Sequence, residues 1–258
     1  MKEIKKIRYI FLEIIIIAVG SLMISSDLIE SSKDIKDMYL YYFSHNFIGQ
    51  ELSIIHIIIS LLPISVIIAM YVDSLSYDID KNAKYIFTRT SKRKRWFLSE
   101  LLKIFKELIL VDIILFIIAF IIFYILGYRI VSFLEFIKVV SKLLILLVLT
   151  HYILIIIANL ISIKASPQYG YIISNLMYIV SILNIYYLSF KNFFALKYIP
   201  FIQHIITIQN NECIRRDILY FSRYINGYSF GDAIIYDLIL LIIVISIGIR
   251  TISKLEFY

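Results

Sequence analysis

The sequence predicts an all-α membrane protein with six transmembrane helices, and three observations support this fold class. Hydrophobic residues make up 61% of the 258 residues, and the mean hydropathy is +0.87. A soluble domain of this composition would leave much of its apolar surface in contact with water. The apolar residues also gather in runs of about 20, the length that crosses a bilayer, and the charged residues concentrate between these runs.

The first predicted span covers residues 9–25 and follows a basic start, residues 2–8. Its apolar run is too long for a signal peptide and no Ala-x-Ala site follows, so we predict an uncleaved span. All spans should be helices, because an isolated strand cannot satisfy its backbone in lipid. No internal repeat is visible, which disfavours an inverted-repeat transporter. The six spans form one transmembrane domain over residues 1–258, and the other five cover residues 53–72, 108–127, 143–163, 171–190 and 233–249.

The basic residues predict the orientation of these spans. With the N-terminus inside, the cytoplasmic segments hold 16 of the 26 Lys and Arg residues. By the positive-inside rule, both termini therefore face the cytoplasm, and the net charge of +7 reflects this bias rather than a nucleic-acid partner. We interpret one basic cluster before the third span as a topology signal and anchor, with an interfacial tryptophan beside it: Lys92, Arg93, Lys94, Arg95 and Trp96.

Two loops are long enough to carry structure of their own. The cytoplasmic loop, residues 73–107, follows the second span with acidic residues, a mixed stretch and then the basic cluster. We expect a short helix along the membrane in its first part, up to Thr88, instead of a bare connector. The external loop, residues 191–232, contains an apolar stretch around Pro200 with the length of a helix that dips into the bilayer and returns. Residues 133–142 are expected to lie flat at the outer interface.

Ionisable residues inside the spans are candidates for function, because their burial in lipid is costly. Glu13, Asp112 and Asp237 lie near predicted span ends, where a structural or interfacial role is the simpler interpretation. His151 lies deeper, and its simplest role is a hydrogen bond to another helix through Asn159 or Asn175.

Signatures of common enzymes and metal sites are absent from the sequence. There is no Gly-x-Ser-x-Gly, His-Glu-x-x-His or paired-glutamate motif and no Walker A sequence, so this chain cannot hydrolyse ATP in the P-loop manner. Cys213 is the single cysteine, which excludes an intrachain disulfide and a thiolate metal cluster.

Together these features resemble the permease subunits of ATP-binding-cassette (ABC) transporters of the six-span exporter class. The resemblance rests on six spans with both ends inside, a Pro-containing external segment before the last span, and the loop after the second span. In that loop Asp73 and Asp78 precede residues 85–93, Tyr-Ile-Phe-Thr-Arg-Thr-Ser-Lys-Arg, which are similar to the family's Leu-Leu-x-Thr-x-Ser-Arg stretch. The short, Ile-rich form is similar to permeases found beside bacteriocin-export and bacteriocin-immunity ATPases.

The resemblance implies a division of labour between chains. The loop would form a coupling helix seated in a groove of a separate ATPase subunit, which binds ATP and Mg²⁺, while this chain has no cofactor and no catalytic residue. It also implies a pair of permeases, identical or similar, with two ATPases in a bacterial plasma membrane. The residues at the ATPase contact would be Asp78, Lys84, Tyr85, Phe87 and Arg89, and those of an external gate Tyr198, Pro200, Phe201 and His204.

The resemblance further implies a hydrophobic peptide as substrate, with a lipid or drug as the alternative. Two other classes of protein stay open. A membrane enzyme would use Asp112, His151 and His56, and would bring them together in one cavity. A membrane anchor or sensor would have no ATPase partner, and its residues 73–88 would be unstructured.

Overall fold

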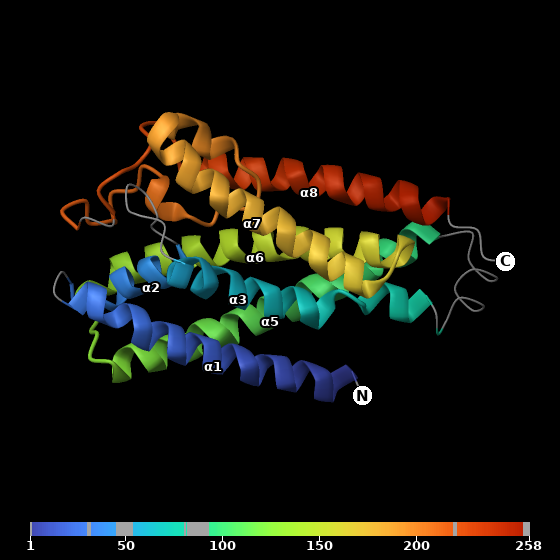
Figure 1. Ribbon diagram of the computed structural model, residues 1–258, viewed down its shortest axis with the longest axis horizontal. Coiled ribbons are helices and arrows are strands. Elements are labelled where there is room, and N and C mark those ends of the chain that lie inside the picture. Colours follow the sequence, from blue (N-terminus) through green and yellow to red (C-terminus); the bar gives the residue numbers. More distant parts are fainter. Residues whose placement is uncertain are drawn as a thin grey trace.

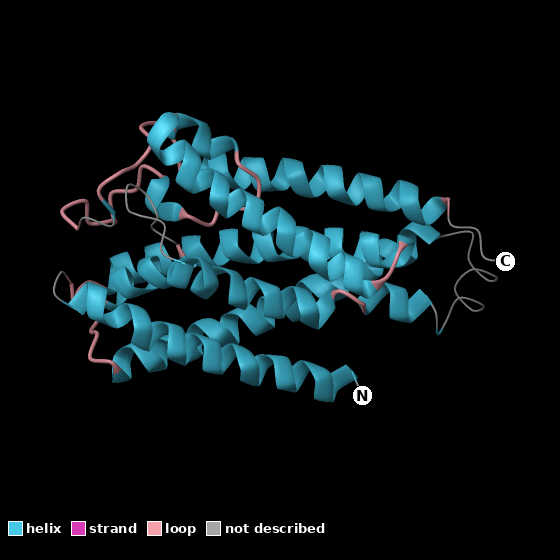
Figure 2. Ribbon diagram, viewed as in Figure 1, coloured by secondary structure: helices cyan, strands magenta, loops and turns pink. Residues whose placement is uncertain are grey.

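The computed structural model describes residues 2–29, 32–44, 54–79, 81, 93–218 and 221–254. Within these ranges the protein is all-α, and a single bridge between Asp34 and Arg129 is the sole β-type pairing (Figure 2). Six of the described helices are long and apolar enough to cross a membrane, which confirms the all-α class and the number of predicted spans. They are α1 (Lys2–Ile29), α3 (Ile54–Tyr71), α5 (Arg93–Ile125), α6 (Phe133–Lys164), α7 (Pro167–Lys191) and α8 (Phe230–Ser253), joined by the short α2 (Ile35–Phe43), η1 (Phe193–Tyr198) and η2 (Ile206–Ile208).

Two of the long helices begin well before the predicted spans. Helix α5 starts at Arg93, and α6 runs without a break from Phe133, so residues 133–142 belong to the spanning helix. The amphipathic stretch 96–107 is rich in Leu, Lys and Glu, which are good helix formers, so the helix continues through charged residues that hydropathy excludes. At 1.5 Å per residue α5 is about 50 Å long, more than the ~30 Å of a hydrocarbon core.

Helix α2 was not predicted, and all nine of its residues are buried. Its aromatic side chains pack on α5. The ring centroids of Tyr39 and Phe123 are 5.1 Å apart, and those of Phe43 and Phe116 are 4.7 Å apart. The Tyr39 hydroxyl also donates to the Phe116 carbonyl at 2.5 Å. Residues 39–43 are mostly aromatic but too few to cross a membrane, so the sequence indicated only a loop between two spans at this position.

Helix α6 forms the centre of the bundle, and 78% of its most apolar stretch is buried inside the protein. It packs against α2, α3, α5, α7 and α8. The start of α1, the end of α8, the start of α5 and the α6–α7 turn lie at one end of the bundle, and the segment between α7 and α8 lies at the other (Figure 1). We call these the terminal end and the loop end.

Candidate functional site

Three ionisable side chains from three helices meet in the interior of the bundle. Nδ1 of His151 in α6 lies 3.2 and 3.3 Å from the two carboxylate oxygens of Asp112 in α5. With Nδ1–H donating to the carboxylate, Nε2 keeps its lone pair, and it has no hydrogen-bond partner among the described residues. Glu13 of α1 is also buried, and neither of its carboxylate oxygens has a partner in the described part of the chain.

Glu13, Asp112 and His151 line one small cavity. Its volume of about 30 Å³ is enough for one water molecule but not for an organic substrate. Tyr42 of α2, Ser60 of α3, Tyr178 of α7 and His204 of the loop-end segment complete its polar lining. The arrangement can therefore hold water and protons in the bundle core.

This geometry changes the interpretation of the intramembrane residues. Asp112 lies in the middle of α5 because that helix starts earlier than predicted. The partner of His151 is Asp112 and not Asn159 or Asn175, which bond to backbone groups and to Ser65. Asp237 in α8 is buried away from this cavity, and both its carboxylate oxygens lack a partner within the described ranges.

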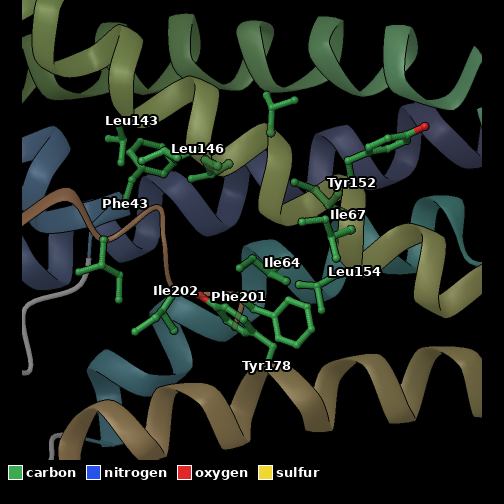
Figure 3. Close-up of a cluster of buried hydrophobic side chains, with 14 of the residues drawn as sticks. Phe43, Ile64, Ile67, Leu143, Leu146, Tyr152, Leu154, Tyr178, Phe201 and Ile202 are labelled. Carbon is green, nitrogen blue, oxygen red and sulfur yellow. The ribbon is translucent and has the colours of Figure 1, made fainter. Parts of the chain in front are cut away.

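The segment between α7 and α8 reaches from the loop end into the bundle. Phe201 and Ile202 belong to the buried cluster that contains Ile64, Leu154 and Tyr178 (Figure 3). His204 lies between α6 and α7, where its ring nitrogens are 3.5 Å from Thr150 Oγ1 and 3.4 Å from the Tyr178 hydroxyl.

The local conformation of this segment is 3₁₀ helix and turn instead of the expected α-helix. Phe201 adopts a positive φ of 63°, a conformation that a bulky residue rarely takes and that breaks a regular helix. Of the four predicted gate residues, Tyr198 is exposed, Pro200 is half-buried, and Phe201 and His204 are buried. That the segment enters a bilayer stays a prediction.

The loop end is held together by charged groups at its base. Buried Lys36 of α2 pairs with Glu135 of α6 at 2.6 Å. Burial raises the pKa of Asp37 above its usual range, although the Ser32 hydroxyl donates to it at 2.6 Å and Arg215 lies 3.9 Å away. Burial also lowers the pKa of Arg216. The ion pairs thus connect α2 to α6 and to the segment between α7 and α8.

The terminal end carries a short helical segment that follows α3. The chain turns at residues 72–73, and residues 74–79 are helical, with Leu75 and Ile79 buried. Asn159 of α6 closes this turn: it donates to the Tyr71 carbonyl at 2.8 Å and accepts the Leu75 N–H at 2.9 Å. A contact of 3.0 Å between the hydroxyls of Ser76 and Ser162 adds a second link to α6.

Only part of the predicted coupling loop can be placed. Asp78 lies in the helical segment and is half-buried. The other predicted ATPase-contact residues and one residue of the basic cluster fall outside the described residues: Lys84, Tyr85, Phe87, Arg89 and Lys92.

The rest of the basic cluster forms the first turn of α5. Lys94 and Arg95 are exposed, Arg93 and Trp96 are half-buried, and Phe97 is fully buried against the bundle. The cluster thus begins a long apolar helix at the terminal end, and its role as an anchor stays a prediction.

An apolar groove opens between α6, α7 and α8. Its volume is about 450 Å³, within the range of ligand pockets in proteins. Pro200 and Phe201, two of the predicted gate residues, line it together with Leu160, Val244 and Lys164.

The roles of Asn159 and Pro63 were not predicted from the sequence. Asn159 and Ser162 are three residues apart, so they share a face of α6, and this spacing could have indicated a polar contact with a neighbouring turn. Pro63 lies inside α3, where it cannot donate to the Ile59 carbonyl, and both residues line the small cavity.

Comparison with known protein families, with curated proteins and with solved structures found no match.

Proposed function

We propose that this chain is the membrane-spanning permease subunit of an ABC transporter that exports a hydrophobic peptide, with a lipid or drug as the alternative substrate. Two separate ATPase subunits would bind ATP and Mg²⁺, and a second permease, identical or similar, would complete the assembly. The chain itself would perform no chemistry. It would supply the path and convert the closure of the ATPases into a change of its own conformation.

The observation that supports this function best is the helical segment 74–79 at the terminal end (Figure 1). Asn159 and Ser162 bind it to the central helix, so a displacement of the segment would be passed to α3 and α6 together. A ligand shifts a two-state protein only through contacts that differ between the states, and a segment fixed to the bundle offers such a contact. An anchor or sensor does not need this element.

The apolar groove supports a hydrophobic substrate. The atoms that line the groove are almost all carbon, and Lys164 supplies a charge at its edge. Helix α8 beside it is the least buried of the six long helices, with exposed Ile235, Ile239 and Ile242 spaced along one face. This spacing suits a helix that faces lipid or a second permease.

A membrane enzyme is the second candidate, and one observation favours it. Asp112 and His151 meet in one cavity, as that hypothesis requires, and Ser60 lines the same cavity. However, the cavity admits only water, and no described nucleophile is held against the free Nε2 of His151. The His56 side chain falls outside the described residues. The permease therefore remains the better-supported function.

Co-purification tests the proposal. The full chain, tagged and produced in its native membrane, is extracted in mild detergent, and the co-purifying proteins are identified by mass spectrometry. We expect an ABC-type ATPase in about equal amount to the permease. Recovery without any ATPase would overturn the proposal, and activity of the purified chain alone on a lipid or peptide bond would favour the enzyme.

A pair of variants tests the contact itself. Tyr85→Asp with Phe87→Asp should detach the ATPase while membrane insertion, measured by protease accessibility, is retained. The matched control is Tyr198→Asp, which alters an exposed aromatic residue at the loop end and should keep the ATPase bound. If the double variant fails to insert, these residues belong to the anchor and not to the ATPase contact.

A further inference from the structure

The cavity at Glu13 is lined by residues whose buried acceptor atoms lack partners in the described part of the chain. Both carboxylate oxygens of Glu13 and Nε2 of His151 lack partners among the described residues, and each of these two residues is 2% exposed. Pro63 leaves the Ile59 carbonyl without its helical donor, and both residues line the same space. Glu13 and His151 thus leave three unpartnered side-chain acceptor atoms in residues that line a volume of about one water molecule.

The charges around the cavity do not balance. With Nε2 unprotonated, His151 is neutral: it gives its one N–H to Asp112 and supplies no positive charge, so Glu13 has no counter-charge. The other titratable groups that face the cavity are Tyr42, Tyr178 and His204, and the described lining contains no lysine or arginine. An uncompensated carboxylate inside a membrane protein is costly, so a positive charge is required next to it.

The size and the donor set limit what that positive charge can be. Among the described residues no three His, Cys, Asp or Glu side chains are placed to hold a metal ion. A substrate ammonium group with its carbon chain exceeds the cavity. A proton, held on the carboxyl or on one bound water, satisfies both limits.

We propose that this cavity is a proton-binding site in which Glu13 holds one proton, shared through a bound water with Nε2 of His151. Asp112 positions the imidazole, because its carboxylate fixes Nδ1 as the protonated nitrogen. Release of the proton leaves the carboxylates of Glu13 and Asp112 both charged on the packed helices α1 and α5, which weakens that contact. The inference is independent of an ATPase partner, and it stands or falls separately from the permease proposal.

Infrared spectroscopy of the purified full chain tests the site. Spectra recorded between about pH 4 and pH 9 cover the range in which carboxyl and imidazole groups titrate. We expect carbonyl bands of protonated carboxylic acids that shift in D₂O, and Glu13→Gln should remove one of them. Asp237→Asn is the matched control: it removes another buried, unpartnered carboxyl and should leave the Glu13 band in place.

A second variant keeps the test decisive if Glu13→Gln does not fold, as judged by circular dichroism. His151→Gln should move the pH at which the Glu13 band disappears, because the shared acceptor is lost. An unchanged midpoint in this variant would overturn the proposal, as would a Glu13→Gln spectrum that retains every carboxylic acid band. A midpoint that follows the sodium concentration at constant ionic strength would identify an alkali-metal ion and also overturn it.

Discussion

The side chain of Asn159 in α6 accepts the backbone N–H of Leu75 at 2.9 Å. Through this bond the central helix holds the first turn of the segment that follows the second span. The same amide donates to the Tyr71 carbonyl, so one side chain connects both sides of the turn. Tertiary contact therefore adds to the local hydrogen bonds of the turn, such as that from the Ser76 hydroxyl to the Asp73 carbonyl at 3.3 Å.

We expect Asn159→Leu to destabilise the protein, because it leaves the buried Leu75 N–H without an acceptor. The loss should be about 1–3 kcal/mol, the cost of an unsatisfied buried polar group. Thermal unfolding in detergent measures it, and stimulation of the partner ATPase should fall in parallel. Asn210→Leu, at an exposed asparagine of the loop end, is the control and should change neither quantity. Unaltered unfolding of the Asn159 variant would show that the turn holds without this side chain.

A second prediction concerns the close contact between α6 and α7. A Cβ atom added to Gly170 would lie 2.4 Å from the Ala158 carbonyl oxygen, which belongs to the helix backbone and cannot move aside. Gly170→Ala should therefore separate the helices at a cost of about 1–3 kcal/mol. Gly231→Ala, whose nearest neighbour is Ser229 Oγ at 3.5 Å, should stay within about 0.5 kcal/mol of the wild type. Equal unfolding temperatures of the two variants would contradict this packing.

The number and type of the long helices were predictable because hydropathy and length determine them. The boundaries were less so: hydropathy ends a span at its first charges, whereas α5 continues through Lys103 and Glu107. Helix α2 escaped prediction because its burial depends on Phe116 and Phe123, which lie far away in the sequence.

The candidate site was predictable only as a list of residues. Glu13, Asp112 and His151 were identified from their cost in a membrane, but their meeting depends on how α1, α5 and α6 rotate and pack. The predicted hydrogen-bond partner of His151, Asn159 or Asn175, was wrong for the same reason. Sequence spacing orders residues along one helix, and it does not determine which residue of another helix they face.

The buried carboxyl of Asp37 predicts a pH dependence. Because its pKa is raised in the folded protein, the folded state holds the proton more tightly than the unfolded state does. Stability contributed by this group is therefore full at acid pH and falls as the pH rises from about 4 through the raised pKa. Asp37→Asn cannot ionise, so its unfolding temperature should exceed that of the wild type near neutral pH, and the difference should shrink toward acid pH.

Asp217→Asn is the control for this pH series. Asp217 is exposed and binds the same Arg215 at 2.6 Å, and that hydrogen bond lowers its pKa. Its removal should not stabilise the protein at neutral pH. A difference between Asp37→Asn and wild type that is constant across the pH series would show that the carboxyl does not titrate in this range.

The last prediction concerns the guanidinium of Arg216, which fastens the segment between α7 and α8. It donates to the carbonyls of Thr207 at 2.8 Å, Gln209 at 2.6 Å and Phe221 at 2.7 Å. It also lies 4.4 Å from the centre of the Tyr224 ring. A planar guanidinium can serve several carbonyls at once, whereas an ammonium acts as a point charge.

Arg216→Met should therefore release the segment, because three carbonyls lose their donor together and all three belong to buried residues: Thr207 in η2, Gln209 directly after it, and Phe221. We expect proteolysis of residues 193–229 to become on the order of tenfold faster, which corresponds to about 1.4 kcal/mol of lost local stability. Arg216→Lys should give an intermediate rate of proteolysis, since it keeps the positive charge but not the planar guanidinium that serves several carbonyls at once. The matched control is Arg223→Met at an exposed arginine of the same segment, which should be cleaved at the wild-type rate. If both methionine variants are cleaved equally fast, loss of any positive charge loosens the segment and the carbonyl contacts of Arg216 do not hold it.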